Sequence, residues 1–515
     1  MSEHKSEGYF MKVRRRILSS ILTAGMVVAL FQAVALGAPE TISGSFTIDT
    51  ENVQPDPTNP DAPPVSVEKE NIYTVDEGAG TVTVRPGAKI TLGGDASDYR
   101  IIVSGSAEPV PGAENGTVEI TLDGFTCDRA PQKTNSGSGT GGTTTGGGGQ
   151  DAGGTGGENQ SGNDNSSGTD TGNEGQGSNP GESGDASGTG VNARAKEDGG
   201  STIALQDNAN VILYLKGTNE VKGGAGAAAV EVPEGNSLTI AQIEGAGSGK
   251  LTAVASGVDS DTTGSGAAIG GNAGQNSGSI TINSGTIEAS VDSDAQGSGA
   301  AIGGGANGSA GAITIKDGTV KATSRGDGAA IGGGSGKGAS AITIENGTVT
   351  ANAGGNGAAI GGGSDGGSGS IVINNGMVVA NATGNGAAIG GGTRGGGGTV
   401  TIANGKVEAT ASGAGASIGG GNAGTGSTVM VTGGEVKANA NIGGGEGATV
   451  QGSLTVRGTG TSVSLVKGTL SELIGGNITV EDGAEVLVEM DENVTVPRGQ
   501  TLTIPANVTL TIASG

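Results

Sequence analysis

The chain has 515 residues, of which 110 are glycine and 2% are aromatic, and its 26 basic and 51 acidic residues give a formal charge of -25. So acidic a surface would repel nucleic acids and anionic membranes, and we therefore exclude nucleic-acid binding. An apolar content of 33% is typical of disordered chains, but a packed fold stays open to a sequence whose apolar residues recur at fixed positions.

The first 37 residues have the layout of a secretory signal. A basic run that starts at Met11 precedes an apolar run from Ile17 to Leu36, and small residues follow. We expect residues 1–37 to be a signal peptide, and residues 1–10 fit a start-site artefact because Met11 heads the basic run. The alternative is an uncleaved anchor, which would be the only contact with a membrane. In both cases we expect the remainder to be secreted or displayed at the extracellular cell surface.

Residues 38–133 contain short alternating runs that end at turn signals, at 81–84, 89–92, 100–103 and 118–122. This pattern predicts the strands of irregular N-terminal β coils. Among them, Cys127 is the only cysteine of the chain, so no internal disulfide can form, and we expect its thiol to be buried. An exposed thiol, the alternative, would allow dimerisation.

Residues 134–200 are almost wholly Gly, Ser, Thr, Asn, Asp, Gln and Glu. Such a segment has too little apolar surface to offset the entropy of ordering, so we expect a disordered insertion. Alternating runs resume at 201–205 and 211–215. We therefore expect residues 201–265 to form further irregular coils, with the insertion projecting from one coil.

One phrase repeats through residues 266–440. It consists of Gly-Ala-Ala-Ile-Gly-Gly-Gly, a Gly/Ser loop, an Ile-Thr-Ile run, an Asn-Gly-like turn and a Thr-Val-Thr-Ala-like run. Its isoleucine recurs at a constant interval, at Ile302, Ile331, Ile360, Ile389 and Ile418. A period of this size, about 29 residues, indicates a solenoid, in which each unit buries its apolar side by stacking on its neighbours.

Alternation within one repeat predicts which side chains point inward. Ile342 and Ile344 share one face of their run, an Asn-Gly pair turns the chain, and Val349 and Ala351 return to the same side. With the Ala-Ala-Ile segment as a third strand, the repeat predicts an all-β, right-handed parallel β-helix with ~29-residue coils and three short strands per coil. The alternative is a stack of antiparallel hairpins, because Asn-Gly is also a strong hairpin signal.

In-register parallel strands would place the inward residues of successive repeats in aliphatic ladders. Burial of four such side chains is worth about 6 to 12 kcal/mol per coil before the entropy cost, so one coil alone would not fold. The predicted ladders are Ile280, Ile313, Ile342, Ile371, Val400 and Val429; Ile282, Ile315, Ile344, Ile373, Ile402 and Val431; and Ile287, Val320, Val349, Val378, Val407 and Val436.

Beyond Ile442 the repeat loosens into runs at 454–456, 478–480, 486–488, 502–504 and 508–512. We expect residues 441–515 to be degenerate C-terminal β coils. No polar capping unit follows them, which fits a truncated reading frame.

The sequence offers little for catalysis. His4 is the only histidine and lies in the predicted signal, which excludes His-based triads and His-ligated metals from the mature chain. The glycine run before Lys337 lacks the spacing and the following helix of a phosphate loop, so it reads as a coil corner. We therefore expect no enzyme activity, no catalytic residues, no cofactor and no metal site.

Two acidic loops keep a calcium alternative open. Asp259-Ser-Asp261 and Asp292-Ser-Asp294 lie one repeat apart and would form a weak site if stacked. Later repeats hold only Asp327 at this place, so we expect solvated acidic loops.

Aromatic stacking on a sugar could only involve the early coils. Its candidates are Tyr73, Tyr99, Phe125 and Tyr214, and for these we expect core packing. Polar recognition by other side chains stays open, and the ligand-binding residues are unknown at this point.

Three phrases carry a resemblance to a known group of proteins. They are Gly-Ala-Ala-Ile-Gly-Gly-Gly, Ile-Thr-Ile-x-Asn-Gly-Thr-Val, and the run at 211–219 that leads into Leu-Thr-Ile at 238–240. Over roughly residues 100–515 the chain resembles secreted carbohydrate-binding-domain-containing or adhesin-like proteins of Gram-positive bacteria. The resemblance implies a parallel β-helix and a surface role with extracellular polysaccharide or host surface glycans as partners. It does not carry over the activity of pectate lyases, since no cluster of Asp ligands with a basic residue is visible.

We expect a monomeric, non-enzymatic solenoid that acts as an adhesin or a polysaccharide-binding stalk. One alternative is a polysaccharide lyase or hydrolase of the parallel β-helix type. A further alternative is an ice-binding protein, because outward threonines form a row that is interrupted by two apolar residues. The row is Thr281, Thr314, Thr343 and Thr401, and the interruptions are Val372 and Met430.

Overall fold

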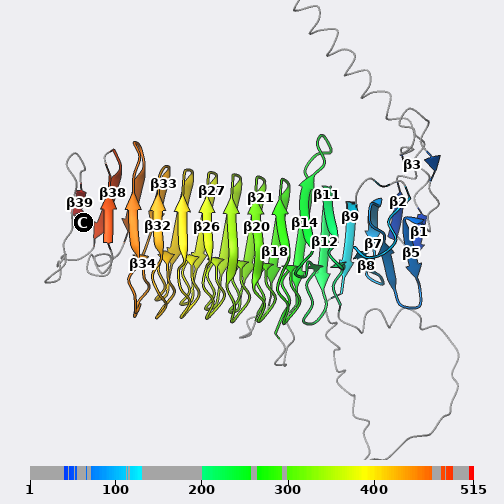
Figure 1. Ribbon diagram of the computed structural model, residues 1–515, viewed down its shortest axis with the longest axis horizontal. Helices are drawn as coiled ribbons and strands as arrows, with labels where there is room; N and C mark the ends of the chain where they lie inside the picture. Colours follow the sequence, from blue (N-terminus) through cyan, green and yellow to red (C-terminus); the bar gives the residue numbers. More distant parts are fainter. Residues whose placement is uncertain are drawn as a thin grey trace, which may run out of the picture. The chain divides into compact units, whose positions relative to one another are not determined.

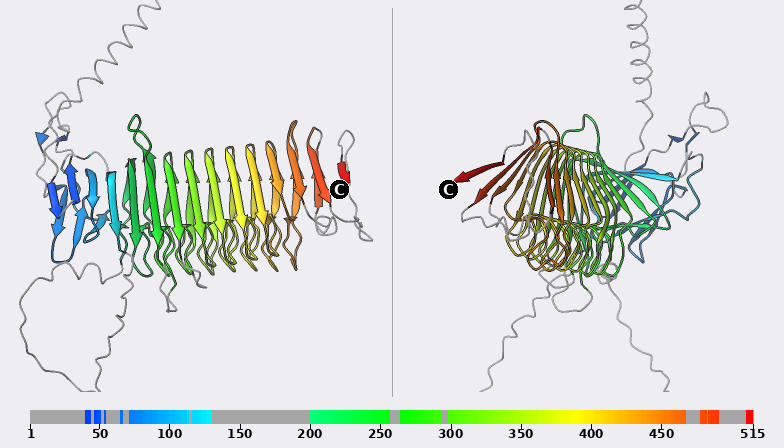
Figure 2. Two further views of the ribbon diagram at one scale, coloured as in Figure 1. Left: turned by 180° about the vertical axis from the view of Figure 1, so that it is seen from behind. Right: turned by 60° about the vertical axis from the view of Figure 1, so that its left-hand side comes forward.

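Three ladders of parallel strands form most of the described part of the chain (Figures 1 and 2). The computed structural model describes residues 40–43, 46–50, 53–54, 65–66, 71–111, 113, 116–129, 200–256, 264–292, 298–466, 477–481, 483–490 and 510–514. Every element that it assigns within these ranges is a β-strand. The predicted signal peptide and residues 134–199 of the predicted insertion lie outside the described residues.

A regular coil contributes one strand to each ladder. In the coil of Ile331, β22 (Ile331–Gly332) belongs to the third ladder, β23 (Ala339–Ile344) to the first and β24 (Thr348–Ala353) to the second. Each strand pairs in parallel with the equivalent strand of the next coil. The parallel β-helix with ~29-residue coils and three short strands per coil is therefore confirmed. The hairpin alternative is wrong, and the right-handed turn stays a prediction.

The first ladder begins with β7 (Lys89–Asp95) and the N-terminal half of β9 (Thr117–Asp128) and runs through ten further strands. These are β11 (Asn210–Lys216), β14 (Ser237–Gln242), β17 (Ser279–Ile282), β20 (Ala310–Ile315), β23, β26 (Ser370–Ile373), β29 (Thr399–Ile402), β32 (Thr428–Val431), β35 (Ser453–Val456) and β37 (Asn477–Val480).

The second ladder begins on the C-terminal half of β9 (Thr117–Asp128), so this long strand serves both ladders. It continues with β12 (Thr218–Gly223), β15 (Lys250–Ala255), β18 (Thr286–Val291), β21 (Thr319–Ser324), β24, β27 (Met377–Ala382), β30 (Lys406–Ala411), β33 (Glu435–Ala438), β36 (Ser462–Val466), β38 (Glu485–Met490) and β39 (Leu510–Ser514).

The third ladder is built from shorter strands. It comprises β6 (Thr81–Val84), β8 (Arg100–Ser104), β10 (Ile203–Gln206), β13 (Val230–Glu231), β16 (Ile269–Gly270), β19 (Ile302–Gly303), β22, β25 (Ile360–Gly361), β28 (Ile389–Gly390), β31 (Ile418–Gly419) and β34 (Ile442–Gly443).

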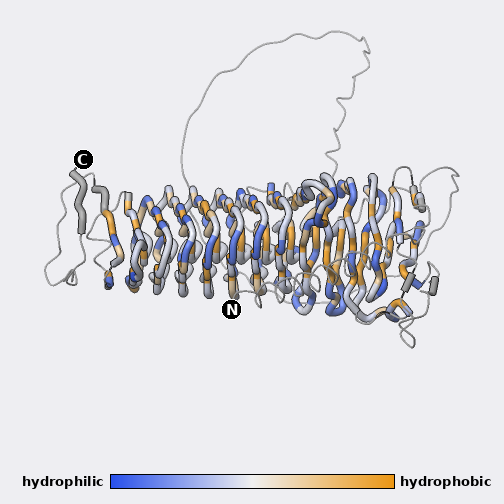
Figure 3. The backbone as a smooth tube through the Cα atoms, turned by 90° about the horizontal axis from the view of Figure 1, so that it is seen from above, coloured by the Kyte–Doolittle hydropathy of each residue, from blue (hydrophilic) through white to orange (hydrophobic). Residues whose placement is uncertain are grey.

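The predicted aliphatic ladders are confirmed residue by residue. Ile342 and Ile344 pair with Ile313 and Ile315 on one side and with Ile371 and Ile373 on the other, and Ile342 and Ile344 are both 0% exposed. Apolar and polar residues alternate along each coil in Figure 3, as one buried and one solvated face require. The inner residues form one continuous core from Phe46 to Val486.

Glycine sets the two kinds of corner in a regular coil. Gly347 has a φ of +97° between β23 and β24, so the glycine of the Asn-Gly pair supplies the left-handed turn. Gly332 has a φ of +139° in the third ladder, and a Cβ there would overlap the carbonyl oxygen of Gly361 in the next coil. The strict Ile-Gly-Gly phrase is therefore required by the close approach of successive backbones.

The N-terminal end departs from the predicted irregular coils. β2 (Phe46–Thr50) pairs antiparallel with both β1 (Glu40–Ser43) and β7 (Lys89–Asp95), and β5 (Tyr73–Asp76) pairs antiparallel with β6. A separate antiparallel pair joins β3 (Val53–Gln54) and β4 (Val65–Ser66). Parallel coils begin only with β6–β8 and β7–β9 pairing, so antiparallel strands cover the first coil edge and protect it from edge-to-edge pairing.

The described residues on either side of the predicted insertion, Arg129 and Gly200, are attached to the stack at one corner. The amide of Arg129, just after β9, donates to the carbonyl of Lys222 at 3.3 Å, and the amide of Gly224 donates to the carbonyl of Gly200 at 3.2 Å. Both ends are thus fixed to the same short segment of the next coil. This corner joins the second ladder to the third.

Within the described residues, no helix is long and apolar enough to span a membrane.

Candidate functional site

A polar hollow of about 430 Å³ lies beside the third ladder, between the links that precede its strands and the loops that follow them. Three consecutive coils line it with equivalent residues. The lining residues are Asp327 and Ser335 from the first coil, Asn356, Ser364 and Asp365 from the second, and Asn385, Thr393 and Arg394 from the third.

The repeat explains why these side chains meet. Asp327, Asn356 and Asn385 are spaced 29 residues apart, and each precedes the strand that its coil gives to the third ladder. In-register stacking therefore brings them into one column at a rise of about 4.8 Å per coil. Ser364 and Thr393, which follow those strands, form a second column beside the first.

Backbone hydrogen bonds hold the two columns together. The amide of Ser364 donates to the carbonyl of Asp327 at 2.8 Å, and one coil later the amide of Thr393 donates to the carbonyl of Asn356 at 2.9 Å. The same contact recurs between Asn422 and Asn385 at 2.9 Å. The hollow is therefore built on main chain that is tied from coil to coil, which limits the movement of its side chains.

Amide groups join the first column. Asp327 Oδ1 accepts from both the backbone amide and the side-chain Nδ2 of Asn356, each at 3.0 Å. Asn356 Oδ1 accepts in turn from Asn385 Nδ2 at 3.4 Å and from the Thr393 hydroxyl at 3.4 Å. Each side chain is only half-buried, so groups of this network remain open to solvent and to a ligand.

A guanidinium and a carboxylate close the other side of the hollow. Arg394 donates from Nε and Nη2 to the two oxygens of Asp365, at 2.6 and 2.8 Å. Hydrogen bonding to Asp365, together with the charge of that carboxylate, holds the pKa of Arg394 above its usual value. Asp365 and Arg394 both have left-handed backbone, with φ of 62° and 60°, which points equivalent loop side chains toward the same place.

This arrangement is suited to binding. Hydroxyl, amide and carboxylate groups converge on one hollow, and groups of this kind fix the orientation of a polar ligand. Asp365 is paired with Arg394, so the lining carries an excess of one negative charge from Asp327. The lining holds no histidine or cysteine that could form a nucleophile and base pair.

The sequence between the second and third ladders, which supplies the first column of the hollow, is longer in the earlier coils. Residues 256–264 and 292–298 replace the short link that residues 354–357 make in a regular coil, and the insertion after Arg129 has the same place. In solenoids, insertions of single repeats commonly gather on the binding face. The side of the stack that holds these links and the hollow is therefore the best candidate for a functional face.

The residues considered from sequence are dispersed. Lys337 lies in the glycine loop between β22 and β23, and no helix follows it. Asp292 is exposed and lies 3.9 Å from Arg325, whereas Asp259, Asp261 and Asp294 lie outside the described residues. No group of three or more His, Cys, Asp or Glu in the described part of the chain is placed to hold a metal ion.

The aromatic residues divide into two sets. Tyr73, Tyr99 and Phe125 are buried as expected, and Phe46 packs between Tyr99 and Phe125 with ring centroids at 5.6 and 6.2 Å. The expectation of core packing is wrong for Tyr214, which is half-buried on the outer face of β11 between Thr121 and Ala241. Its neighbours Leu213 and Leu215 take the two inward positions, so alternation leaves Tyr214 outside.

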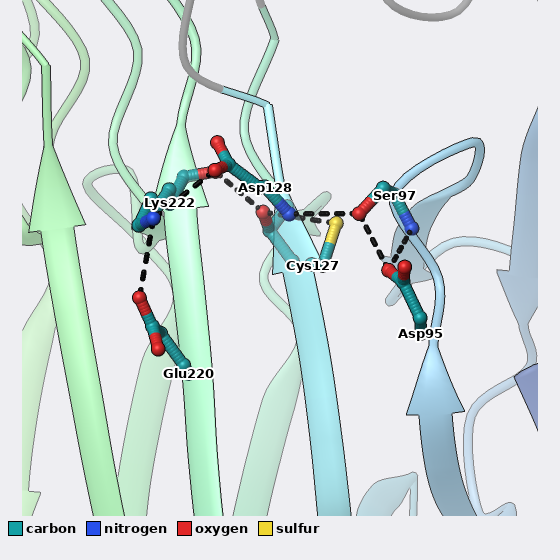
Figure 4. A network of polar contacts seen from close by, with 7 residues as sticks. Asp95, Ser97, Cys127, Asp128, Glu220 and Lys222 are labelled. Atoms are coloured by element: carbon teal, nitrogen blue, oxygen red, sulfur yellow. Dashed lines mark hydrogen bonds and ion pairs between the residues drawn. The ribbon is translucent and has the colours of Figure 1, made fainter.

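Cys127 is buried, as expected, beside a polar network of the early coils (Figure 4). Its thiol lies 3.4 Å from the carbonyl oxygen of Ala96 and accepts from the Thr202 hydroxyl at 3.4 Å. Burial raises the pKa of this thiol to about 11. A thiol of this kind stays protonated and inert at neutral pH, which argues against a reactive or cross-linking role.

The network itself is an ion-pair cluster on the surface of β9 and β12. Lys222 donates to Asp128 at 3.0 Å and lies 3.2 Å from Glu220. The hydrogen bond to Asp128 raises the pKa of Lys222 against the opposing effect of burial. Asp128 is linked through its backbone amide to Ser97, which donates to Asp95. These contacts hold the C-terminal end of β9 in place before the predicted insertion, and we assign them a structural role.

In the sequence, Asp327 stands out only as the remnant of the earlier acidic loops. The recurrence of Asp327, Asn356 and Asn385 at the repeat spacing was a usable signal for a polar column. No family model, no curated protein and no solved structure matches the chain.

Proposed function

We propose that the protein is a secreted or cell-surface solenoid without enzyme activity, and that it binds a polysaccharide or a host surface glycan in the polar hollow. The observation that carries this proposal is the convergence of Asp327, Asn356, Asn385 and Thr393 from three consecutive coils. The stack would serve as an adhesin or stalk that holds this hollow away from the chain's point of attachment.

The periodicity of the hollow suits a chain molecule. Two coil steps separate its outer residues Asp327 and Asn385, a distance of about 9.6 Å along the stack. A short stretch of an oligosaccharide aligned with the stack would meet hydroxyl and amide groups at each step. Recognition of this kind relies on hydrogen bonds alone, because no aromatic side chain lines the hollow.

Charge favours particular sugars. The lining of the hollow has a net charge of one negative unit, from Asp327, and the chain as a whole has a formal charge of -25. Uronate or sialic acid groups would therefore meet repulsion, whereas neutral sugars and amino sugars would not. We propose neutral or amino-sugar polymers as the ligand class.

The test is a binding panel with two matched variants. Purified protein is titrated with neutral, amino-sugar and uronate polysaccharides, and Asn356→Ala is compared with Asn375→Ala. Both variants remove an asparagine from a stacked pair, because Asn375 donates to Asn346 at 3.3 Å on another corner. We expect Asn356→Ala to lower the affinity by at least about tenfold and Asn375→Ala to leave it unchanged.

Three results would contradict the proposal. Absence of binding to every polysaccharide and host glycan at about 1 mM would remove the binding function and leave only a spacer. Equal binding by both variants would remove the hollow as the site. Release of products from acidic polysaccharides in the presence of calcium would show an enzyme.

A further inference from the structure

The outer face of the second ladder carries an ordered row of charges. Its central row runs along the stack in register from Thr252 to Ser464, and each member is the pairing partner of the next. The row is Thr252, Glu288, Lys321, Thr350, Val379, Glu408, Lys437 and Ser464. From Glu288 to Lys437, the charges of the successive residues are negative, positive, neutral, neutral, negative and positive.

Among the residues that the structure describes, most of these charges lack an ion-pair partner. Glu288 is paired with Lys250 at 2.8 Å. Lys321, Glu408 and Lys437 make no ion pair within 4.0 Å among the residues that the structure describes. Lys321 and Lys437 are exposed and Glu408 is half-buried, so all three can reach a partner from outside.

The middle of this face is uncharged and partly apolar. Met377 lies beside Thr348 in the neighbouring row and is 45% exposed, one of two large hydrophobic side chains with such exposure in the described residues. Val379 is half-buried next to it on the same outer face. An apolar centre within a charged rim is the usual layout of a protein interface.

We propose that a second copy of this chain packs on this face with its coils in the opposite order. The two-fold axis would run parallel to the strands, between the coil of Thr350 and the coil of Val379. Each row would then face itself in reverse, as an isologous interface requires. Lys321 would meet Glu408 of the other copy, and Glu288 would meet its Lys437, with every contact made twice.

The rows on either side of the central row also make contacts without charge repulsion in this arrangement. On one side Met377 would meet Thr348, and Lys406 would meet Thr319. On the other side Asn381 would meet Asn352. None of these contacts brings like charges together, and Met377 would lose its exposure to water.

Other two-fold arrangements of the same face bring like charges together. If the two stacks ran in the same direction, Glu288, Lys321, Glu408 and Lys437 would each face themselves. A shift by one coil in one direction sets Lys321 against Lys437, and a shift in the other sets Glu288 against Glu408. Like charges at these places repel, so among the two-fold arrangements the opposite order at this register is favoured over the same direction and over a shift by one coil.

The size of the face sets the expected strength. Six coils at about 4.8 Å and six residues at about 3.3 Å cover roughly 600 Å² on each copy, or about 1,200 Å² in total. This is the low end for a specific interface, so we expect a dimer with a Kd of about 1–100 µM that weakens as salt is raised. The monomer expected from the sequence would prevail only below such concentrations.

Charge reversal tests the proposal. Sedimentation equilibrium on the purified protein measures Kd for the wild type, Lys321→Glu, Glu408→Lys and the double variant. Each single change creates two like-charge contacts and is expected to raise Kd by at least about tenfold. The double variant exchanges the two charges and is expected to restore the dimer. Lys337→Glu makes the same charge change away from the face and should leave Kd unchanged.

Each result of this experiment either supports or overturns the proposed dimer. A wild type that stays monomeric at about 1 mM in low salt would overturn the proposal, as would a dimer that is indifferent to Lys321→Glu. Thermal unfolding of each variant verifies that it is folded, and a folded double variant that fails to dimerise would also overturn it. A dimer that persists when polysaccharide binding is absent would support this interface independently of the hollow.

Discussion

The early coils and the regular coils differ at the second residue of the third-ladder strand. In the regular coils the second residue of each third-ladder strand is glycine, with φ between 136° and 149° from Gly303 to Gly419. In the early coil of β13 the equivalent residue is Glu231, the pairing partner of Gly270, and it is 6% exposed. Its carboxylate accepts from Arg100 at 2.8 Å and from Ser201 at 2.9 Å.

Glycine and Glu231 therefore represent two ways of packing successive coils at this position. Where neighbouring coils are alike, the backbones approach so closely that only glycine fits, and the corner is fixed by sterics. Where the coils are unlike, a buried side chain occupies this position, and its polar groups need hydrogen-bond partners. The early coils are also filled by larger side chains, such as Phe125, Leu213 and Leu215.

The largest expected effect tests the steric corner. Gly361→Ala would place a Cβ against the carbonyl oxygen of Gly390 at a φ of +136°. We expect a loss of more than about 4 kcal/mol in the free energy of unfolding, or failure to fold, because both backbones would have to move. Urea unfolding followed by far-UV circular dichroism measures it.

Gly367→Ala is the matched control in the same coil. Its backbone does not require glycine, and the nearest atom to an added Cβ is Gly396 O at 3.4 Å, which is ordinary contact. A change of less than about 1 kcal/mol is expected. Equal losses for both variants would remove the distinction between the corner glycine and the loop glycines.

An intermediate effect tests the polar corner. Glu231→Ala leaves Arg100 and Ser201 without their shared acceptor, and we expect a loss of about 3 kcal/mol. The Arg100 side chain is 27% exposed and can recover some hydration, so the cost is below that of a fully buried pair. Arg100→Ala combined with Glu231→Ala should cost less than the sum of the single changes. Strict additivity in this double-mutant cycle would show that the pair does not act as a unit.

The smallest expected effect concerns Cys127, in the core of the early coils. Its pKa is about 11 in the folded chain against an ordinary 9.0, because burial disfavours the thiolate. A raised folded pKa means that the stabilising contribution is complete below about pH 9 and is lost as the pH rises through 11. We expect the wild type to lose about 2 kcal/mol relative to Cys127→Ala across this window.

Unfolding at several pH values measures this difference, and comparison with Cys127→Ala cancels the titration of the other groups. A gap between the two proteins that is constant from pH 8 to about 11 would contradict the assignment. As an independent check, the native thiol should resist maleimide at neutral pH and react once the chain is unfolded.

The regular coils could be predicted almost completely from sequence. Alternation and the repeat spacing placed Ile342, Ile344 and Val349 inside, and these are the positions that stack. The reason is that identical neighbours give each residue the same environment in every coil, so a local pattern determines the packing. The same regularity predicted the glycine corners.

The ends and the site were harder to predict for physical reasons. Alternation gives a strand but not its direction, so the antiparallel pairing of β2 with β7 was not foreseen. Tyr214 could have been placed outside, because Leu213 and Leu215 occupy the inward phase. The hollow depends on the left-handed backbone of Asp365 and Arg394, which are not glycines, and residue type gives little warning of that conformation.

The attachment of Arg129 and Gly200 to neighbouring positions of one coil has a practical consequence. Because Lys222 and Gly224 hold both ends, the number of residues between them can change without shifting any strand on either side. This corner is therefore a suitable insertion site, where an epitope, a protease cleavage sequence or a small reporter domain could replace the native segment. The scaffold would display such cargo at one fixed height along its length.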